Sequence, residues 1–314
     1  MSHLQHLNEK YPVRRTDEEK AAFRAYLTDY VAGRGGNIDV KTTKDGKNKN
    51  VIIGNPLTAD VIFTAHYDTP KCSLFPNLML PRNKVLFYLY QFVPVVILLL
   101  SSILLGWLAF ILSGLIADEP TSVLVGDLTF MLAYYLLFYF MYFAVNNKNN
   151  YNDNTSGVAT LMEIFDRSTQ ENLERTAFIF FDNEEKGLKG SKGYAKEHKD
   201  ALKERLIVNF DCVGNGEHIL FIAKKGAETL PAYQALQETF LSKADGDYTS
   251  AFYPMKGSIA NSDYKSFECG VGCMACKKNK KGIFYAPYIH TAKDRVAKDE
   301  NIAFLADTIA QYLA

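Results

Sequence analysis

The sequence predicts an α/β protein with a doubly wound, mostly parallel sheet into which a two-helix hairpin is inserted. Apolar, strand-like segments alternate with helix-like segments along most of the chain, and several of these strands end in polar side chains. Residues 85–116 carry no charged side chain and residues 121–145 carry only one, which predicts the hairpin. We therefore expect one α/β body built from residues 1–82 and 150–314, interrupted by a hairpin at 83–149. Without the hairpin, the remaining chain has the size of a single domain.

The N-terminal part is expected to contribute a helix and a buried strand. Residues 17–34 begin with acidic side chains and place Phe23 and Leu27 at helical spacing. Residues 41–50 are polar, and we interpret them as a turn. Residues 61–68 (VIFTAHYD) are typical of a buried strand that delivers polar side chains at its carboxyl end.

Each of the two apolar segments is long enough to cross a lipid bilayer. A membrane-spanning helix needs about 20 apolar residues, and a helix that is apolar on all sides has to be buried in protein or in lipid. Nothing else in the sequence is apolar enough to surround such a hairpin, so a core hairpin is the less favoured alternative. We expect 85–116 and 121–145 to contact the lipid bilayer, joined by the short acidic connector 117–120.

The charges that flank the hairpin predict its orientation. Lys71, Arg82 and Lys84 precede the first apolar segment. Lys148 follows the second, whereas the connector carries only acidic side chains. Because basic residues concentrate in cytoplasmic loops, we expect a two-pass protein of the cell membrane with its α/β body in the cytoplasm.

Overall composition narrows the possible partners and compartments. The chain carries 35 basic and 35 acidic side chains, so electrostatics gives no reason to expect a nucleic-acid partner. Its five cysteines are odd in number and lack the spacing of a disulfide-rich secreted domain, which favours a reducing compartment. The first residues lack the apolar segment of a signal peptide, which agrees with a cytoplasmic body.

After the hairpin, apolar strands again alternate with helices. Residues Thr155, Ser156 and Gly157 are typical of a helix start, since hydroxyl side chains accept hydrogen bonds from free backbone N–H groups. Cys273 and Cys276 form a lone CxxC pair, which we interpret as buried thiols on a strand rather than as a metal site. The predicted strands are 176–185, 206–214, 218–225 and 271–278, and the predicted helices are 155–168, 190–204, 231–243 and 299–313.

Histidine and carboxylate side chains recur at the predicted strand ends and turns. Ligands of doubly wound sheets bind at the carboxyl ends of the strands, so these side chains are expected to meet. Oxygen and nitrogen donors without a thiolate suit a pair of zinc-like divalent ions that share one carboxylate. Two such ions can lower the pKa of a shared water and stabilise a tetrahedral oxyanion. The candidate metal ligands are His66, Asp153, Glu185, Asp211 and His290.

Two further carboxylates are candidate catalytic residues. Asp68 lies two residues after His66 on the same strand, faces the same side, and would orient the imidazole. Glu184 neighbours Glu185, and it would take a proton from the shared water and pass it to the leaving amine. Each of these residues taken alone has an ordinary explanation as a solvated or loop side chain. Their ordered occurrence at strand ends and turns favours a site.

Five short motifs occur in order along the chain. They are HYD at 66–68, NDNTSGV at 152–158, FFDNEEKGLKGS at 180–191, NFDCVG at 209–214 and YIHTAKD at 288–294. In this order they resemble the M28 family of co-catalytic zinc exopeptidases. The segment NSDYKSF at 261–267 also resembles the part of that family that precedes its last strand. The resemblance covers most of the chain outside residues 71–149.

This resemblance assigns a role to each candidate. It implies that Asp153 bridges two zinc ions and is followed by a cis peptide bond to Asn154. It further implies that His66 and Asp211 complete one zinc site and that Glu184 is the general base. Glu185 and His290 would complete the second site.

The sequence departs from the family pattern in two places. The segment between His66 and Asp153 is a short loop in soluble relatives, so the hairpin is expected to be inserted beside the site. Some relatives place a tyrosine immediately before the last histidine to assist the oxyanion, whereas this chain has Ile289 there. Tyr288 and Tyr285 are the candidates to replace it.

We therefore expect a membrane-anchored, zinc-dependent aminopeptidase that removes N-terminal residues from peptides. Because the hairpin would place the site near the bilayer, apolar or membrane-derived peptides are the expected substrates. One alternative is an M20-like hydrolase of N-acyl amino acids or dipeptides, but that family inserts a second domain where this chain has only the segment between Asp211 and His290. Further alternatives are a glutaminyl-cyclase-like enzyme, which would hold one zinc ion, and a non-catalytic peptide-binding protein, whose ligand set would normally be damaged.

Overall fold

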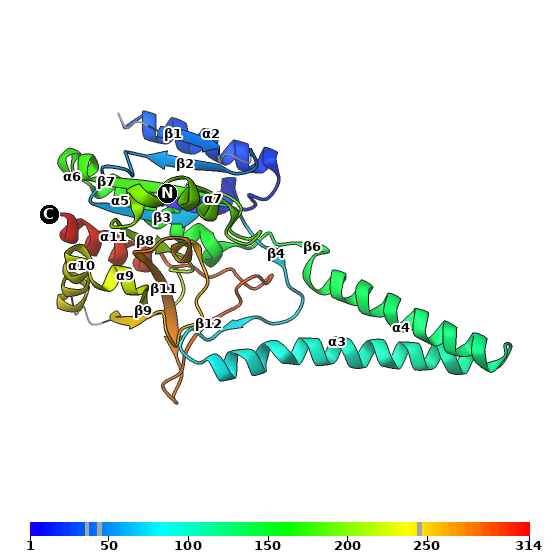
Figure 1. Ribbon diagram of the computed structural model, residues 1–314. Coiled ribbons are helices and arrows are strands. Elements are labelled where there is room, and N and C mark those ends of the chain that lie inside the picture. Colours follow the sequence, from blue (N-terminus) through cyan, green and yellow to red (C-terminus); the bar gives the residue numbers. More distant parts are fainter. Residues whose placement is uncertain (35–37, 43–45, 244–246) are drawn as a thin grey trace.

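The computed structural model describes residues 1–34, 38–42, 46–243 and 247–314. It consists of an α/β body and a long helical hairpin that projects from it (Figure 1). The fold class predicted from the sequence is confirmed. The proposed division of the chain at residues 83 and 149 stays a prediction.

Four adjacent parallel strands form the centre of the sheet. Each is flanked on at least one side by a parallel neighbour. The outer strands pair antiparallel, except that β10 runs parallel to β9. The strand order is β1-β2-β7-β3-β8-β11-β12-β5, and β9 pairs with β11 and with β10. The strands of the sheet are β1 (Ile38–Thr42), β2 (Lys49–Ile53), β3 (Val61–His66), β5 (Leu78–Met79), β7 (Thr176–Phe181), β8 (Leu206–Phe210), β9 (His218–Ala223), β10 (Thr249–Pro254), β11 (Gly270–Lys278) and β12 (Phe284–Pro287).

Strand β3 shows why the centre of the sheet is apolar throughout. Its Val61 and Phe63 side chains belong to one hydrophobic cluster, and its Ile62 side chain belongs to a second cluster. Helices on both faces complete these clusters, so alternate residues of the strand are buried in opposite directions. The first cluster includes side chains of α1 (His3–Lys10), α2 (Asp17–Ala32), α5 (Gly157–Arg167), α9 (Lys225–Glu228), α10 (Pro231–Ser242) and α11 (Asp299–Leu313), with α6 (Gln170–Arg175) beside it; the second includes side chains of α7 (Lys189–Glu197) and α8 (Lys199–Leu202).

Two sequence predictions need correction. Residues 41–50 are not simply a turn, because Thr42 and Lys49 pair in the antiparallel ladder of β1 and β2, although 43–45 lie outside the described residues. Polar residues occupy this strand because they hold a neighbouring loop: the Asn50 side chain donates to the Gly190 carbonyl at 3.1 Å. The predicted helix 190–204 is two helices, α7 and α8, which are interrupted at His198.

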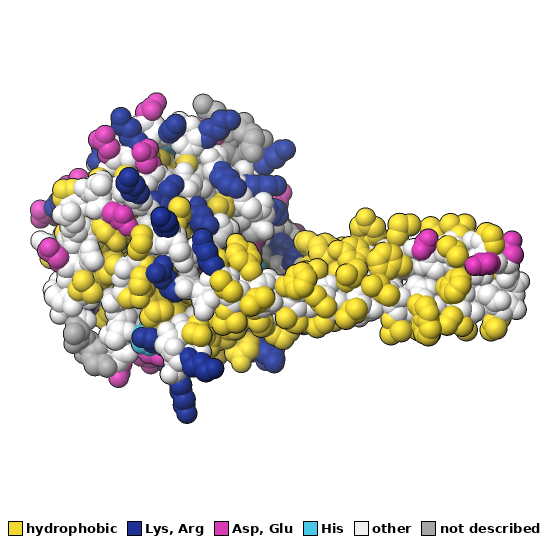
Figure 2. All heavy atoms as spheres, turned by 60° about the horizontal axis from the view of Figure 1, so that its bottom comes forward, with side chains coloured by type: hydrophobic (Ala, Val, Ile, Leu, Met, Phe, Trp, Pro, Cys, Tyr) yellow, Lys and Arg dark blue, Asp and Glu magenta, His cyan; other side chains and the backbone are white. Residues whose placement is uncertain are grey.

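The inserted segment forms the helices α3 (Lys84–Ser113) and α4 (Glu119–Tyr142). Both are long and apolar enough to cross a membrane, and most of their surface is uncovered by the chain itself. Leu100 is 60% exposed and Trp107 is 55% exposed. Apolar side chains cover the projecting hairpin, with acidic side chains at its tip (Figure 2).

Small residues bring the two helices together near the far end of the hairpin. A Cβ atom added to Gly106 would lie 2.9 Å from the Gly126 carbonyl oxygen, so only glycine fits this crossing. Ser102 of α3 and Ser122 of α4 are also buried, one helical turn away from each glycine. Towards the body the helices separate (Figure 1).

The hairpin joins the body through a short two-stranded ribbon. Strands β4 (Lys71–Cys72) and β6 (Val145–Asn146) pair antiparallel where the chain enters and leaves the insertion. We call this ribbon the neck. It is separate from the ten-stranded sheet of the body.

Candidate metal centre

The first candidate ligand, His66, is the last residue of the central strand β3. Its imidazole is buried, and its Nδ1 atom lies 3.1 Å from the carbonyl oxygen of Asp68. The Asp68 carboxylate lies farther from this nitrogen, at 3.6 Å. It instead accepts hydrogen bonds from the backbone N–H groups of Glu184 at 2.9 Å and Glu185 at 3.2 Å. Asp68 therefore links His66 to the segment that carries Glu184 and Glu185.

Asp153 lies in a kinked turn, η1 (Tyr151–Ser156), that leads into α5. The peptide bond between Asp153 and Asn154 is cis, as the family resemblance implies. The Asn154 side chain fixes this turn to the end of β8, because its amide donates to the Phe210 carbonyl at 3.0 Å and its oxygen accepts from Cys212 N–H at 3.2 Å. The sheet thus positions a residue that belongs to no strand.

The loop after β7 carries Glu184 and Glu185. A buried lysine from α2 holds this loop: Lys20 Nζ donates to Asp182 Oδ1 at 2.8 Å and to Asn183 Oδ1 at 3.0 Å. Burial raises the pKa of the Glu184 carboxyl, and the neighbouring Glu185 carboxylate raises it further, although His66 opposes both.

Asp211 follows β8, and His290 lies in the loop between β12 and α11. The backbone N–H of Asp211 donates to the Cys273 carbonyl at 3.0 Å, which ties the end of β8 to β11. The carbonyl of His290 accepts a hydrogen bond at 2.6 Å from Ser73 N–H, one residue beyond the neck. A second bond runs from the Asn147 amide on the other side of the neck to the Thr291 carbonyl at 3.2 Å.

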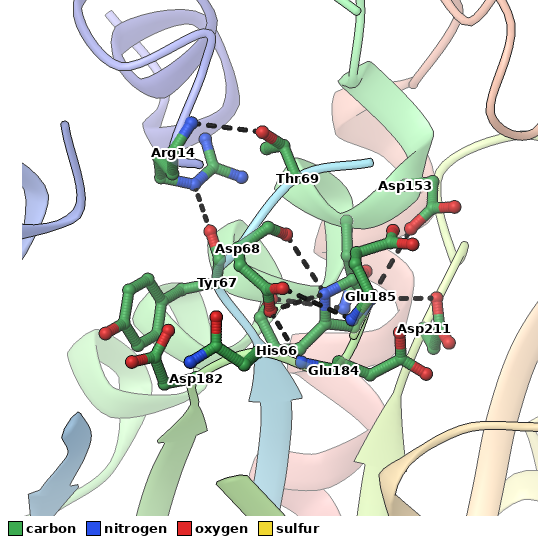
Figure 3. A network of polar contacts seen from close by, with 12 residues as sticks. Arg14, His66, Tyr67, Asp68, Thr69, Asp153, Asp182, Glu184, Glu185 and Asp211 are labelled. Atoms are coloured by element: carbon green, nitrogen blue, oxygen red, sulfur yellow. Dashed lines mark hydrogen bonds and ion pairs between the residues drawn. The ribbon is translucent and has the colours of Figure 1, made fainter. Parts of the chain in front are cut away.

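The five candidate ligands converge in the structure. Figure 3 labels four of them, His66, Asp153, Glu185 and Asp211. Asp153 lies between the two histidines: its Oδ1 is 3.4 Å from His66 Nε2, and its Oδ2 is 3.0 Å from His290 Nε2. Asp211 Oδ1 is 3.7 Å from His66 Nε2, and Glu185 Oε2 is 3.3 Å from His290 Nε2. Two groups of donors therefore share Asp153, namely His66, Asp153 and Asp211 in one, and Asp153, Glu185 and His290 in the other. A third, overlapping group consists of His66, Glu184 and Glu185.

The chemistry of these donors fits a divalent cation. Buried oxygens of Glu185 and Asp211 have no hydrogen-bond partner among the described residues. A buried carboxylate without a partner is costly, and a coordinated cation removes that cost. Imidazole nitrogens with carboxylate oxygens are common zinc ligands.

A cavity of ≈ 300 Å³ opens beside these donors. Apolar side chains, including Met274 and Ile289, line part of it together with the histidines and carboxylates. One tyrosine, Tyr264, lines this cavity among the described residues, and its hydroxyl donates a hydrogen bond to the Ala260 carbonyl at 2.9 Å. Assistance of an oxyanion by Tyr285 or Tyr288 stays a prediction.

Three buried charged residues beside the site were not identified as functional from the sequence. Asp294 accepts the backbone N–H groups of Asn152 and Asp153, both at 3.0 Å, and burial raises the pKa of its carboxyl to about 8. Asp263 is fully buried, and burial raises the pKa of its carboxyl to about 7. Asp263 lies in NSDYKSF and Asp294 in YIHTAKD, and their places in these motifs were the feature of the sequence that could have indicated a role.

Arg14 is the third of these residues. Its guanidinium is buried and donates to the Tyr67 carbonyl at 2.5 Å and to Thr155 Oγ1 at 3.1 Å. Burial lowers the pKa of Arg14 to about 10, although Asp68 and Asp153 oppose this shift. It links the segment after β3 to the turn that carries Asp153, and its position after α1 gave no sequence signal.

The comparisons with known proteins agree with this geometry. The sequence model of peptidase family M28 matches residues 144–313, more than half of the chain. Sequence comparison with curated proteins finds no match.

Solved structures show the same fold at low sequence identity. A Porphyromonas gingivalis glutaminyl cyclase aligns over 99% of this chain and 95% of its own, with 14% identity and a TM-score of 0.57. The Legionella pneumophila LapA aminopeptidase aligns over 99% of this chain and 68% of its own, with 15% identity and a TM-score of 0.53. A Macrostomum lignano glutaminyl cyclase aligns over 99% of this chain and 87% of its own, with 12% identity and a TM-score of 0.56.

The family match favours the M28 interpretation over the M20-like alternative. It covers four of the five candidate ligands, namely Asp153, Glu185, Asp211 and His290, together with the motif that carries Glu184. The chain therefore belongs to peptidase family M28, as a metallo-exopeptidase with a zinc-peptidase-like site.

Proposed function

We propose that the protein is a membrane-anchored aminopeptidase that uses two zinc ions, or similar divalent ions, to remove N-terminal residues from peptides. The observation that carries this proposal is the pair of donor groups that share the Asp153 carboxylate. Within it, His66 and Asp211 would hold one ion, and Glu185 and His290 the other. Bound ions would lower the pKa of a water molecule and stabilise the oxyanion that forms during hydrolysis.

The residues of the chain would perform the proton transfers and the positioning. Glu184 would take a proton from the attacking water, whose oxygen forms a bond to the carbonyl carbon of the peptide. Breaking the carbon–nitrogen bond releases the amine, to which Glu184 would return the proton. Asp68 would hold the Glu184 and Glu185 backbone in place through its two accepted hydrogen bonds.

Membrane anchoring is proposed from the hairpin. The exposed surface of α3 and α4 is apolar, and lipid suits two helices of this length with so few charged side chains. Basic side chains gather on the body near the base of the hairpin, whereas acidic ones occupy the tip (Figure 2). This asymmetry supports a cytoplasmic body.

The direct test measures aminoacyl-anilide hydrolysis by the full-length protein in detergent, before and after a chelator and after zinc is returned. We expect loss and recovery of activity, with two metal ions bound per chain. Glu184→Gln should reduce kcat by about 10²–10⁴-fold while leaving the metal content unchanged. Activity that is indifferent to the chelator, or a Glu184→Gln protein that turns over normally, would contradict the proposal.

Glutaminyl cyclases and aminopeptidases share this fold, so the reaction product and the metal content have to distinguish the two functions. Cyclisation of an N-terminal glutamine with release of ammonia, together with one bound metal ion, would favour that alternative. Release of the N-terminal amino acid would favour the aminopeptidase.

A further inference from the structure

A second cavity, of ≈ 680 Å³, lies between the separating helices of the hairpin and the α/β body. Glu185 and His290 line both this cavity and the smaller one beside the metal donors. The two spaces therefore meet at the proposed metal centre. We call the larger space the hairpin cavity.

The hairpin cavity changes in character along its length. At the metal centre it is polar, with the basic side chains of Arg15, Lys71 and Lys186. Away from the centre, its wall consists of apolar and aromatic side chains from both helices. Those of α3 are Pro94, Val95 and Leu98, and those on the α4 side are Tyr134, Phe138, Tyr142 and Phe143.

The charges around the two cavities indicate the direction in which a peptide lies. Among the described residues, no lysine or arginine lines the smaller cavity, so the positively charged N-terminus of a peptide meets no ammonium or guanidinium group there. Arg15, Lys71 and Lys186 line the mouth of the hairpin cavity and repel that group, and the carboxylates at this mouth are Asp68 and Glu185. The N-terminal residue therefore belongs in the smaller cavity, and the rest of the chain has to leave towards the hairpin or into solvent.

The dimensions of the apolar wall match a short peptide segment. From Gln91 to Leu98, the part of α3 that lines the cavity, the helix rises by roughly 10 Å at 1.5 Å per residue. From Tyr134 to Tyr142, α4 rises by roughly 12 Å. Extended peptide rises about 3.3 Å per residue, so about three or four residues would cover this length.

We propose that the hairpin cavity binds the residues that follow the cleaved bond of an apolar peptide, which enters from the bilayer between α3 and α4. This inference rests on the proposed aminopeptidase function and adds its substrate class, namely peptides that are apolar for several residues after the N-terminal one. A bond at the polar mouth is cut, and the apolar remainder stays against the hairpin.

The test compares two hexapeptides that share the first two residues and differ in the next three, apolar in one and Ser/Thr in the other. With the full-length protein in lipid nanodiscs, we expect kcat/KM to be at least 10-fold higher for the apolar peptide. Leu98→Trp fills the cavity and should reduce this ratio to below 3-fold. Leu100→Trp is the matched control, since Leu100 lies on the same helix but points away from the cavity and is 60% exposed; it should keep the wild-type ratio.

The possible failures are distinguishable. If the wild-type protein shows no chelator-sensitive hydrolysis of a short aminoacyl-anilide, the proposed function fails. If the anilide is hydrolysed but the wild-type ratio is close to one, or if the two tryptophan variants behave alike, the hairpin-cavity inference is overturned while the function stands.

A second measurement does not depend on the folding of a hairpin variant. A peptide with a photoreactive residue at its fourth position, bound to Glu184→Gln protein, should crosslink to residues 91–98 or 134–143. Crosslinks confined to the surface of the body would overturn the inference.

Discussion

Replacing Asp294 tests whether the metal centre depends on a carboxylate that accepts hydrogen bonds from the backbone around Asp153. The two Asp294 oxygens accept N–H groups of Asn152 and Asp153 at 3.0 Å, and the side chain is buried. Asp294→Ala leaves two buried N–H groups without partners, at about 1–3 kcal/mol each, so unfolding should become easier by about 2–6 kcal/mol. Asp294→Asn keeps one acceptor and should lose about half of that.

The same change should weaken metal binding. Without Asp294, nothing else among the described residues accepts these two hydrogen bonds, and the turn that carries Asp153 is less firmly placed. Removing a partner of this kind typically lowers metal affinity by about 10–100-fold. We expect that range for Asp294→Ala, measured by competition with a chromophoric zinc chelator at a temperature where the variant stays folded.

A matched control separates this effect from the loss of any acidic side chain. Asp60 lies on the surface, in an exposed ion pair with Arg175 at 2.8 Å, and Asp60→Ala should leave zinc affinity unchanged. If Asp294→Ala binds zinc as tightly as the wild-type protein and unfolds at the same denaturant concentration, Asp294 does not position the site.

Three further predictions concern the hairpin and the loop after β7. Gly106→Ala places a Cβ atom 2.9 Å from the facing carbonyl oxygen and should destabilise the hairpin by about 1–3 kcal/mol. Gly114→Ala is the control and should leave the hairpin as stable as before, because the nearest neighbour of its Cβ atom lies at 3.4 Å. Equal thermal unfolding of the two variants would contradict this packing. All five native cysteines are buried, so Thr121→Cys at the tip should make intact cells reactive to a membrane-impermeant maleimide, and labelling only after lysis would reverse the proposed orientation. Lys20→Met leaves the buried Asp182 carboxylate unpaired and should cost about 3–5 kcal/mol in urea unfolding, and a loss below 1 kcal/mol would show that the pair is not needed.

The sequence was most informative where one geometric rule applies. His66 ends β3, and Glu185 and Asp211 follow β7 and β8. These three strands are neighbours in the sheet, and the carboxyl ends of parallel strands meet at one edge. Their convergence could therefore be expected from the strands alone. Asp153 and His290 lie in loops, and only the family resemblance indicated where they belong.

The features that were missed depend on contacts between distant segments. Arg14 and Asp294 are buried charges in irregular segments, and Asp263 begins the short 3-10 helix η2 (Asp263–Ser266), so no periodicity marks their burial. Edge strand β10 was missed because half-buried residues on a sheet edge resemble a loop in sequence. Residues 41–50 were predicted to be a turn because they are polar. One of these polar side chains, Asn50, lies on a buried strand, where it donates to the Gly190 carbonyl and accepts from the Asp182 N–H group.

The neck has a practical consequence for anyone who wishes to shorten this enzyme by removing its hairpin. Ser73 and Asn147, which adjoin its two strands, each hold the backbone of the loop that carries His290. Deleting the apolar helices and splicing the body across the gap would therefore disturb a candidate metal ligand as well as remove the proposed membrane anchor. Any shortened form needs these two hydrogen bonds preserved, and its zinc content should be checked before its catalytic rate is compared with that of the intact chain.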